Sequence, residues 1–291
     1  PPRSTLLSYT TLFRSSIPGQ DIQCRCVGLA FYPELIAEME GVSMQEQLGS
    51  DTPPVQDLPQ FEENRLSNLP EYLRNNFEEL QKEFNFAGTP TGDIETQVKN
   101  LVADGGINPH YRDSMYMKKG FRKYQYTENC QRCVPALQMK MKGFDIEALP
   151  LPKKTPDYSD MIYGSNWYTW LKDKNGNLVK PINVYSDLCS KSLLGTPILS
   201  TESVLKHLYS LVMETPEGSM FEIKCKWKIG GGHVFSVFSA GEKGIIIYEP
   251  QTNVVKNNLY FNRMKPETIE IIRTDDKVID MDRIKQACKN K

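Results

Sequence analysis

Three stretches of the chain repeat apolar side chains at three- and four-residue steps, with charged residues between them. They cover residues 61–83, 93–103 and 201–214. This spacing is typical of amphipathic helices that bury one face. Asp93 stands where it can cap the first turn of the second helix, and the third begins after a pair of hydroxyl residues. We therefore predict three amphipathic helices.

A second pattern, which predicts strands, dominates the C-terminal part. Residues 221–228 alternate between apolar and charged side chains, so we expect a half-exposed strand with its Glu and Lys residues facing water. Residues 233–240 and 244–249 are apolar on both faces, as in central strands, and the glycine-containing turn between them predicts a hairpin. Residues 268–273 predict another strand, and residues 281–289 a closing helix.

Between these regions lies a helix that begins with cysteine. We expect it to run from Cys130 to Lys142, where a glycine follows that can end it. Residues 120–129 before it are predicted to form a polar loop, and residues 144–149 after it a short extended segment. Residues 150–200 are rich in Pro, Asn, Asp and Tyr, which predicts short elements and irregular backbone.

These elements divide the chain into three predicted parts of an α+β protein. Residues 4–15 resemble the conceptual translation of a sequencing adapter, so we interpret residues 1–18 as an artefact or a disordered tail. Residues 19–103 are predicted to be a helical accessory or linker region. Residues 104–291 are predicted to be the catalytic domain, because the candidate chemistry gathers there.

Composition excludes several classes of protein. The chain has 35 basic and 36 acidic residues and a net charge of −1, so it lacks the overall basic character of nucleic-acid-binding proteins. No apolar run reaches the roughly 18 residues that a membrane-spanning helix requires. The seven cysteines are odd in number and sparse, which favours reduced thiols over a disulfide scaffold.

The cysteines leave one metal alternative open. Cys24 and Cys26 form one close pair and Cys130 and Cys133 another, and four thiolates are a ligand set for zinc. The first pair has C-x-C spacing, whereas structural zinc sites favour C-x-x-C in both halves. Buried cysteines that act as small hydrophobic residues are the commoner alternative.

Cys130 and Cys133 are the candidate nucleophiles, because the first-turn amides of a helix stabilise a thiolate. Asn129, directly before Cys130, is placed to donate its side-chain amide to an oxyanion, which favours Cys130. Pro135 favours Cys133 instead, since a proline is better tolerated in the first turn of a helix than at its sixth position. We favour Cys130 and leave both open.

His233 is the best candidate for a general base among the three histidines. Three glycines precede it, which permits a tight bend or close approach of a ligand, and it then begins a central strand that would hold it rigidly. His110 lies in a loop, and His207 lies on the polar side of a predicted helix. The alternative for His233 is a hydrogen-bonded core histidine without a catalytic role.

Glu249 and Gln251 are the candidates for the group that orients the base. The predicted hairpin returns the end of its second strand to the start of its first, so Glu249 is expected beside His233. We expect its carboxylate to accept Nδ1–H of the histidine, and the amide oxygen of Gln251 is an alternative acceptor. A strand-end turn with no role is the simpler interpretation of this segment alone.

Taken together, these segments resemble the papain-fold glutamine deamidase toxin domain, which occurs in bacterial polymorphic toxins and in phage head-morphogenesis-type proteins. The similarity covers about residues 104–291. It lies in the lead-in INP at 107–109, NCQRCVPA at 129–136 with GFDIEALP at 143–150, GHVF at 232–235 and YEPQTN at 248–253; the ending RTDD at 273–276 is also similar. Glu249 stands where the family usually has Asp.

The resemblance implies a papain-like cysteine-enzyme fold, in which an N-terminal helix carrying Cys packs on an antiparallel sheet carrying His and Glu/Gln. It implies thiol-dependent deamidation of glutamine on a protein substrate, with no cofactor and no metal. It also implies a bacterial or phage protein, delivered into a target cell or carried in a virion, and an immunity protein as a partner. No nucleic-acid or membrane partner is expected.

Two alternatives remain open at this stage. The same constellation supports a cysteine peptidase, an isopeptidase or a transglutaminase, because all of them share an acyl-thioenzyme and differ in what the groove accepts. The other alternative is a non-enzymatic virion or scaffold component with a degenerate papain fold, which the Glu249 departure favours.

Overall fold

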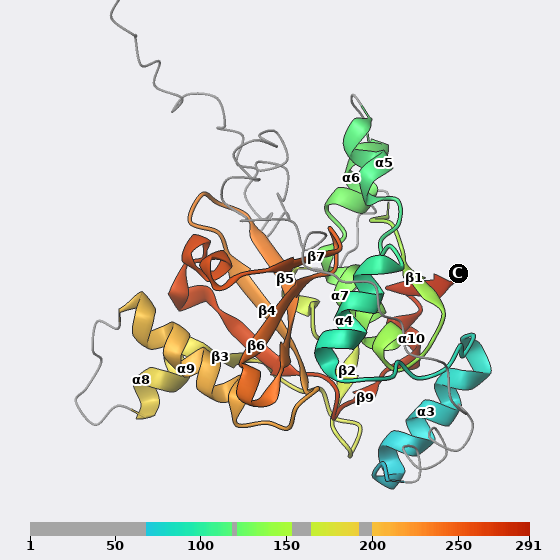
Figure 1. The fold of residues 1–291 in the computed structure, drawn as a ribbon, viewed down its shortest axis with the longest axis horizontal. Coiled ribbons are helices and arrows are strands. Elements are labelled where there is room, and N and C mark those ends of the chain that lie inside the picture. The colour runs from blue at the N-terminus through green and yellow to red at the C-terminus, as the bar shows by residue number, and fades with distance from the viewer. Residues whose placement is uncertain (1–67, 118–120, 153–163, 192–199) are drawn as a thin grey trace, which may run out of the picture.

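The computed structural model describes residues 68–117, 121–152, 164–191 and 200–291 (Figure 1). This part of the chain is an α+β protein whose sheets are all antiparallel. Its main sheet has six strands in the order β3-β8-β4-β5-β6-β7. In that order the strands are Ile182–Asn183, Glu270–Arg273, Met220–Lys226, Gly232–Ser239, Ile245–Glu249 and Val254–Lys256.

Helices cover both faces of this sheet (Figure 1). One face packs against α7 (Cys130–Met141), whose Leu137 shares an apolar core with Phe238 of β5. The other face packs against α8 (Val184–Lys191) and α9 (Thr201–Met213) in a second core. The sheet is therefore the middle layer, and α7 runs along it.

The N-terminal helices belong to the same body. Helices α3 (Glu71–Glu83) and α4 (Ile94–Ala103) contribute buried residues to the core around α7. The side-chain amide of Asn76 exchanges two hydrogen bonds of 2.9 Å with the backbone of Ile279. The described residues of α3 and α4 therefore pack against the core around α7. Helices α5 (Tyr111–Tyr116) and α6 (Phe121–Thr127) form a projection at the top of Figure 1.

Two pairs of short strands complete the fold. Each pair joins a segment from the middle of the chain to one near its C-terminal end. Strand β1 (Ile146–Ala148) pairs with β10 (Cys288–Asn290), and β2 (Leu171–Lys172) pairs with β9 (Val278–Ile279). Helix α10 (Met281–Ile284) connects β9 to β10. The expected closing helix is therefore wrong beyond its first turn, because the chain becomes extended to pair with β1.

Local signals predicted several boundaries correctly. The carboxylate of Asp93 caps α4 by accepting the Thr96 amide at 2.9 Å, and Ser200 caps α9 in the same way. Gly143 follows α7 with a φ of 97°, a conformation that glycine adopts without strain. The predicted loop before Cys130 is wrong, since α6 occupies most of it.

Strand β4 differs most from expectation, because both of its faces are covered along its first four residues. Glu222, predicted to face water, is fully buried, and the strand is central in the sheet. Its carboxyl oxygens make no hydrogen bond within the described part of the chain. Burial raises the pKa of Glu222 well above its ordinary value, although the indole N–H of Trp170 acts in the opposite direction.

Replacement of Glu222 by Gln should therefore stabilise the protein at neutral pH. A raised folded-state pKa means that wild-type stability is highest below the unfolded pKa of about 4.5 and falls as pH rises. We expect Glu222→Gln to increase the free energy of unfolding by ~1–3 kcal/mol at pH ~7, and the gain to vanish near pH ~4. Urea unfolding across this pH range measures it. The matched control is Glu267→Gln at an exposed position, and a gain independent of pH would contradict the interpretation.

Candidate functional site

Cys130 is the first residue of α7 and lies at the end of the helix that meets the start of β5. Asn129 is the N-cap residue, but its side chain makes no capping hydrogen bond. Pro135 lies inside the helix, so the sequence accommodates a proline at the sixth position there. The partial positive charge of the helix N-terminus acts on the Cys130 sulfur, which favours a thiolate.

His233 and Glu249 meet across the β5–β6 hairpin, as the sequence predicted. His233 follows a glycine turn in which Gly230 and Gly231 have φ of 99° and 82°, and it begins the buried part of β5. Its Nε2 contacts the Oε2 of Glu249 at the end of β6. The expected Nδ1 contact is therefore wrong, and Nδ1 remains as the ring nitrogen available to the sulfur of Cys130.

The histidine interacts with both neighbours in the buried site. Burial alone would lower the pKa of His233, but the negative charge of Glu249 and the hydrogen bond and charge of the Cys130 side chain outweigh it and raise that pKa to about 10. His233 is 3% exposed, so little solvent screens these charges. Both neighbours therefore favour the protonated form of His233.

Cys133 differs from Cys130 in its electrostatic surroundings. Burial, followed by the charges of Cys130 and Glu249, raises the pKa of Cys133 well above its ordinary value. Its neighbours therefore keep Cys133 a neutral thiol, whereas Cys130 is the cysteine whose side chain bonds to His233. The two cysteines therefore differ in their surroundings, and which of them attacks stays a prediction.

The amides of Asn129 and Gln251 form a network beside the triad. Asn129 donates its two amide hydrogens to Oδ1 of Asn108 at 3.2 Å and to the carbonyl of Leu149 at 3.1 Å. Gln251 donates its amide to Asn129 at 3.3 Å, and its backbone N–H donates to Glu249 at 3.2 Å. Neither side chain holds the place expected from the sequence: Asn129 does not point its donors at a substrate, and Gln251 does not accept from His233.

Asn108 joins this network from a distant segment. Its amide donates to the backbone carbonyls of Tyr126 and Gln251, both at 2.9 Å, and to Asn129. It lies in the INP segment that carries part of the family resemblance. The sequence alone could not predict that its side chain connects the segments of Tyr126, Asn129 and Gln251, because these segments meet only in the folded chain. The network fixes the chain on both sides of Cys130 and Glu249.

Two aromatic residues of the site escaped sequence reasoning. The hydroxyl of Tyr260 donates to Oε2 of Glu249 at 2.7 Å, so this carboxylate oxygen is shared between Tyr260 and His233. The ring of Trp227 stacks on His233 with centroids 5.4 Å apart and an interplanar angle of 26°. An aromatic face next to an imidazolium is favourable because the ring face is electronegative. The position of Trp227 shortly before the three glycines was the signal that could have identified it as a site residue. The sequence around Tyr260 contains no such signal.

The other candidate features lie apart from this site. His207 bonds to Asp187 at 2.7 Å, and the ring of His110 lies 5.0 Å from that of Tyr126 at a tilt of 55°, so both have local partners. Cys24 and Cys26 lie outside the described residues, and within the described ranges no group of three or more His, Cys, Asp or Glu could hold a metal ion. None of the helices in those ranges is long and apolar enough to cross a membrane.

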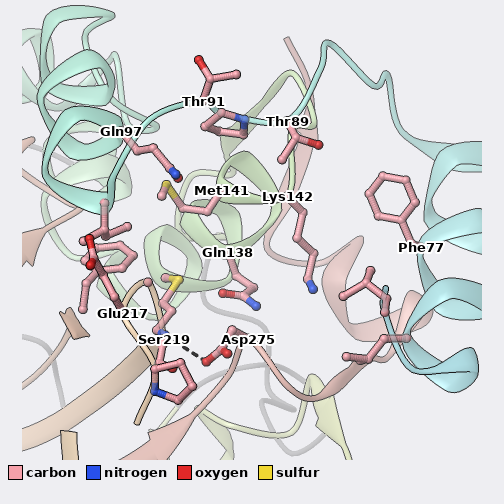
Figure 2. A pocket seen from close by; sticks show the side chains of 18 of the residues that line it. Phe77, Thr89, Thr91, Gln97, Gln138, Met141, Lys142, Glu217, Ser219 and Asp275 are labelled. Carbon is pink, nitrogen blue, oxygen red and sulfur yellow. Dashed lines mark hydrogen bonds between the residues drawn. The ribbon is translucent and has the colours of Figure 1, made fainter. Parts of the chain in front are cut away.

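A pocket of about 860 Å³ opens near the other end of α7 (Figure 2). It lies between α3, the loop before α4 and the segment around Ser219, and Lys142 and Asp275 point into it. Its lining contains neither cysteine nor histidine. The pocket therefore offers no nucleophile–base pair, and the thiol chemistry belongs to the N-terminal end of α7.

The raised pKa of His233 predicts a titration that NMR can follow. Its stabilising effect is fully present below the unfolded pKa of about 6.5 and is lost as pH rises through 10. With histidine-labelled protein, we expect one of three imidazole signals to titrate near pH 10 and to move down by at least ~1 unit in Glu249→Gln. Glu267→Gln is the matched control, and a His233 signal that titrates near pH 6.5 in the wild type would sink the ion-pair interpretation.

Alkylation separates the two cysteines. Because the side chain of Cys130 bonds to His233, whereas the pKa of Cys133 is raised well above its ordinary value, Cys130→Ser should abolish the fast phase of iodoacetamide labelling and Cys133→Ser should keep it. His233→Ala should slow the fast phase by ~10-fold or more. Mass spectrometry of the labelled peptides gives the rates. A fast phase that survives in Cys130→Ser would assign the reactive thiol elsewhere.

Comparison with known proteins adds no assignment to this site. No protein-family model, curated protein or solved structure matches the chain. The case for a functional centre therefore rests on the buried side chains of Cys130, His233 and Glu249 and on the elements that bring them together.

Proposed function

We propose that this protein is a papain-like thiol hydrolase that converts glutamine side chains of a target protein to glutamate. The observation that carries the proposal is the contiguous chain of contacts from Cys130 through His233 to Glu249. A nucleophile at a helix start, a base on a strand and a carboxylate that orients the base are the components of thiol acyl transfer.

The first half of the reaction forms a thioester. The Cys130 thiolate attacks the carboxamide carbon of the glutamine and gives a tetrahedral intermediate. The His233 imidazolium then gives its proton to the amide nitrogen, the carbon–nitrogen bond breaks, and ammonia leaves. Glu249 and Tyr260 keep the imidazole oriented throughout, because Glu249 holds the ring nitrogen that faces away from the sulfur.

The second half consumes water. Neutral His233 takes a proton from a water molecule, the resulting hydroxide attacks the thioester, and the carbon–sulfur bond breaks. The products are glutamate on the target and the restored thiolate–imidazolium pair. The net reaction is glutamine plus water to glutamate plus ammonia, and no cofactor or metal enters it.

Backbone amides are the preferred donors to the oxyanion in this proposal. Both amide hydrogens of Asn129 are directed to protein carbonyl oxygens. The backbone N–H groups of Arg132 and Cys133 donate to the carbonyl of Asn129 at 2.8 and 3.1 Å, so the proposal assigns the oxyanion to the backbone N–H groups of Cys130 and Gln131 at the start of α7. We therefore assign stabilisation of the oxyanion to backbone N–H groups at the start of α7 and not to the side chain of Asn129.

The burial of the site bears on both the proposed function and a second candidate function. Cys130 is 0% exposed, so a substrate side chain reaches the sulfur only when neighbouring groups move. The same burial favours the second candidate, a non-enzymatic virion or scaffold component in which the triad serves the fold. A carboxamide is neutral and narrow, which suits entry into a buried site better than a charged side chain does.

Proteome-wide mass spectrometry tests the function. Bacterial and eukaryotic lysates are incubated with the wild-type protein, with Cys130→Ser and with the matched control Cys133→Ser. We expect glutamine-to-glutamate conversion at defined sites, lower by ~10³-fold or more in Cys130→Ser and retained in Cys133→Ser.

The same spectra distinguish the alternatives. New peptide termini indicate a peptidase, lost branched linkages an isopeptidase, and new isopeptide cross-links a transglutaminase. Identical spectra for the wild type and Cys130→Ser would refute the enzyme and favour the binding protein. An immunity protein that binds this site would suppress the conversion.

A further inference from the structure

Four basic residues lie on two paired segments next to the catalytic histidine. The chain leaves β4 through Lys226 and Lys228, and a second segment passes beside it through Arg263 and Lys265. The amide of Lys228 donates to the carbonyl of Arg263, and that of Lys265 to the carbonyl of Lys226, both at 2.9 Å. We call these four residues the basic patch.

The register of this pairing sets like charges opposite each other. The two segments are antiparallel, with Trp227 opposite Met264, so Lys226 lies opposite Lys265 and Lys228 opposite Arg263. Cross-strand pairs of like charge destabilise a sheet. The patch is therefore an arrangement that folding alone does not explain.

The described carboxylates do not neutralise the patch. Within the described residues, none of the four forms an ion pair, and the nearby exposed Glu267 pairs with none of them. Lys226 and Lys228 are exposed, and Arg263 and Lys265 are partly exposed. The whole chain has a net charge of only −1, so these four positive charges are a local excess.

Stacked rings connect the basic patch to the reacting centre. The Arg263 guanidinium lies 5.2 Å from the centre of the Trp227 ring, and the ring of Trp227 stacks on His233 at 5.4 Å. Only one indole therefore separates the patch from the histidine. At the tip of the same turn, Ile229 is 76% exposed, so an apolar side chain stands among the positive charges. The β4–β5 turn that carries it can be followed in Figure 1.

We propose that the basic patch is the surface that recognises the substrate: it binds an acidic segment of the target protein close to the glutamine that is modified. The inference rests on the proposed function for what happens at the glutamine, but the binding itself does not require turnover. Positive charges beside a buried site attract an acidic segment and fix its register. Ile229 offers a contact for an apolar residue within that segment.

Two fluorescent peptides test this surface. Each carries one glutamine and one leucine; in the first they are flanked by glutamates, and in the second by lysines. Fluorescence anisotropy measures their binding to the full chain at ~50 mM and ~200 mM salt, where screening differs strongly. Mass spectrometry of the same samples reports conversion of the glutamine, which is the separate readout for the proposed function.

Charge reversal provides the decisive comparison. Lys226→Glu/Lys228→Glu should weaken binding of the acidic peptide by about tenfold or more at the lower salt, because like charges then face each other. The matched control Lys174→Glu/Lys206→Glu changes the net charge equally at exposed positions elsewhere and should stay within about twofold of wild type. Lys226→Gln/Lys228→Gln supplies a milder variant, and urea unfolding checks that every variant keeps the fold.

The outcomes separate the two proposals. Selective, salt-sensitive binding that the patch variants lose supports the basic patch, even if the glutamine remains unconverted, in which case only the deamidase function fails. Equal binding of both peptides, or equal losses in the patch and control variants, overturns the basic patch whatever happens to the glutamine.

Discussion

The contact between His233 and Glu249 is the interaction on which the proposed chemistry depends. A buried carboxylate and a buried imidazole each lose hydration, and their pairing offsets that loss only when the geometry is close. The structure meets this condition by placing them on adjacent strands of one hairpin and by adding the Tyr260 hydroxyl to the same carboxylate oxygen. The charge of Glu249 then keeps His233 protonated, and a protonated histidine is the partner that a thiolate requires.

The surrounding fold serves to hold this pair against the end of one helix. Helix α7 runs along β5, so its first residue lies beside the first residues of that strand. The amide network of Asn108, Asn129 and Gln251 fixes the loop before the helix and the turn after β6 to each other. The carboxylate of Glu249 reaches the imidazole from the end of β6.

The sequence was informative where a signal is local and less so where neighbours come from afar. Caps and helix ends such as Asp93 and Gly143 followed from residue chemistry, and the hairpin followed from its turn. The burial of Glu222 did not, because alternation predicts a covered face but not which other element covers the second one. The choice of Nε2 in His233 depends on the angle between strands, and the bridge made by Asn108 depends on a contact 143 residues away. The spacing of apolar residues along the chain gives no information about ring orientation or about contacts between distant segments.

The pairing of β1 with β10 has a consequence for how the protein forms during translation. Strand β1 follows the helix of Cys130 almost directly, yet its partner residues, such as Asn290 opposite Ile146, lie near the far end of the sequence. Contacts between distant residues form late, because a long loop must close first. Strand β1 therefore gains its partner only after β10 has left the exit tunnel, so the pairing next to the helix of Cys130 forms late in translation.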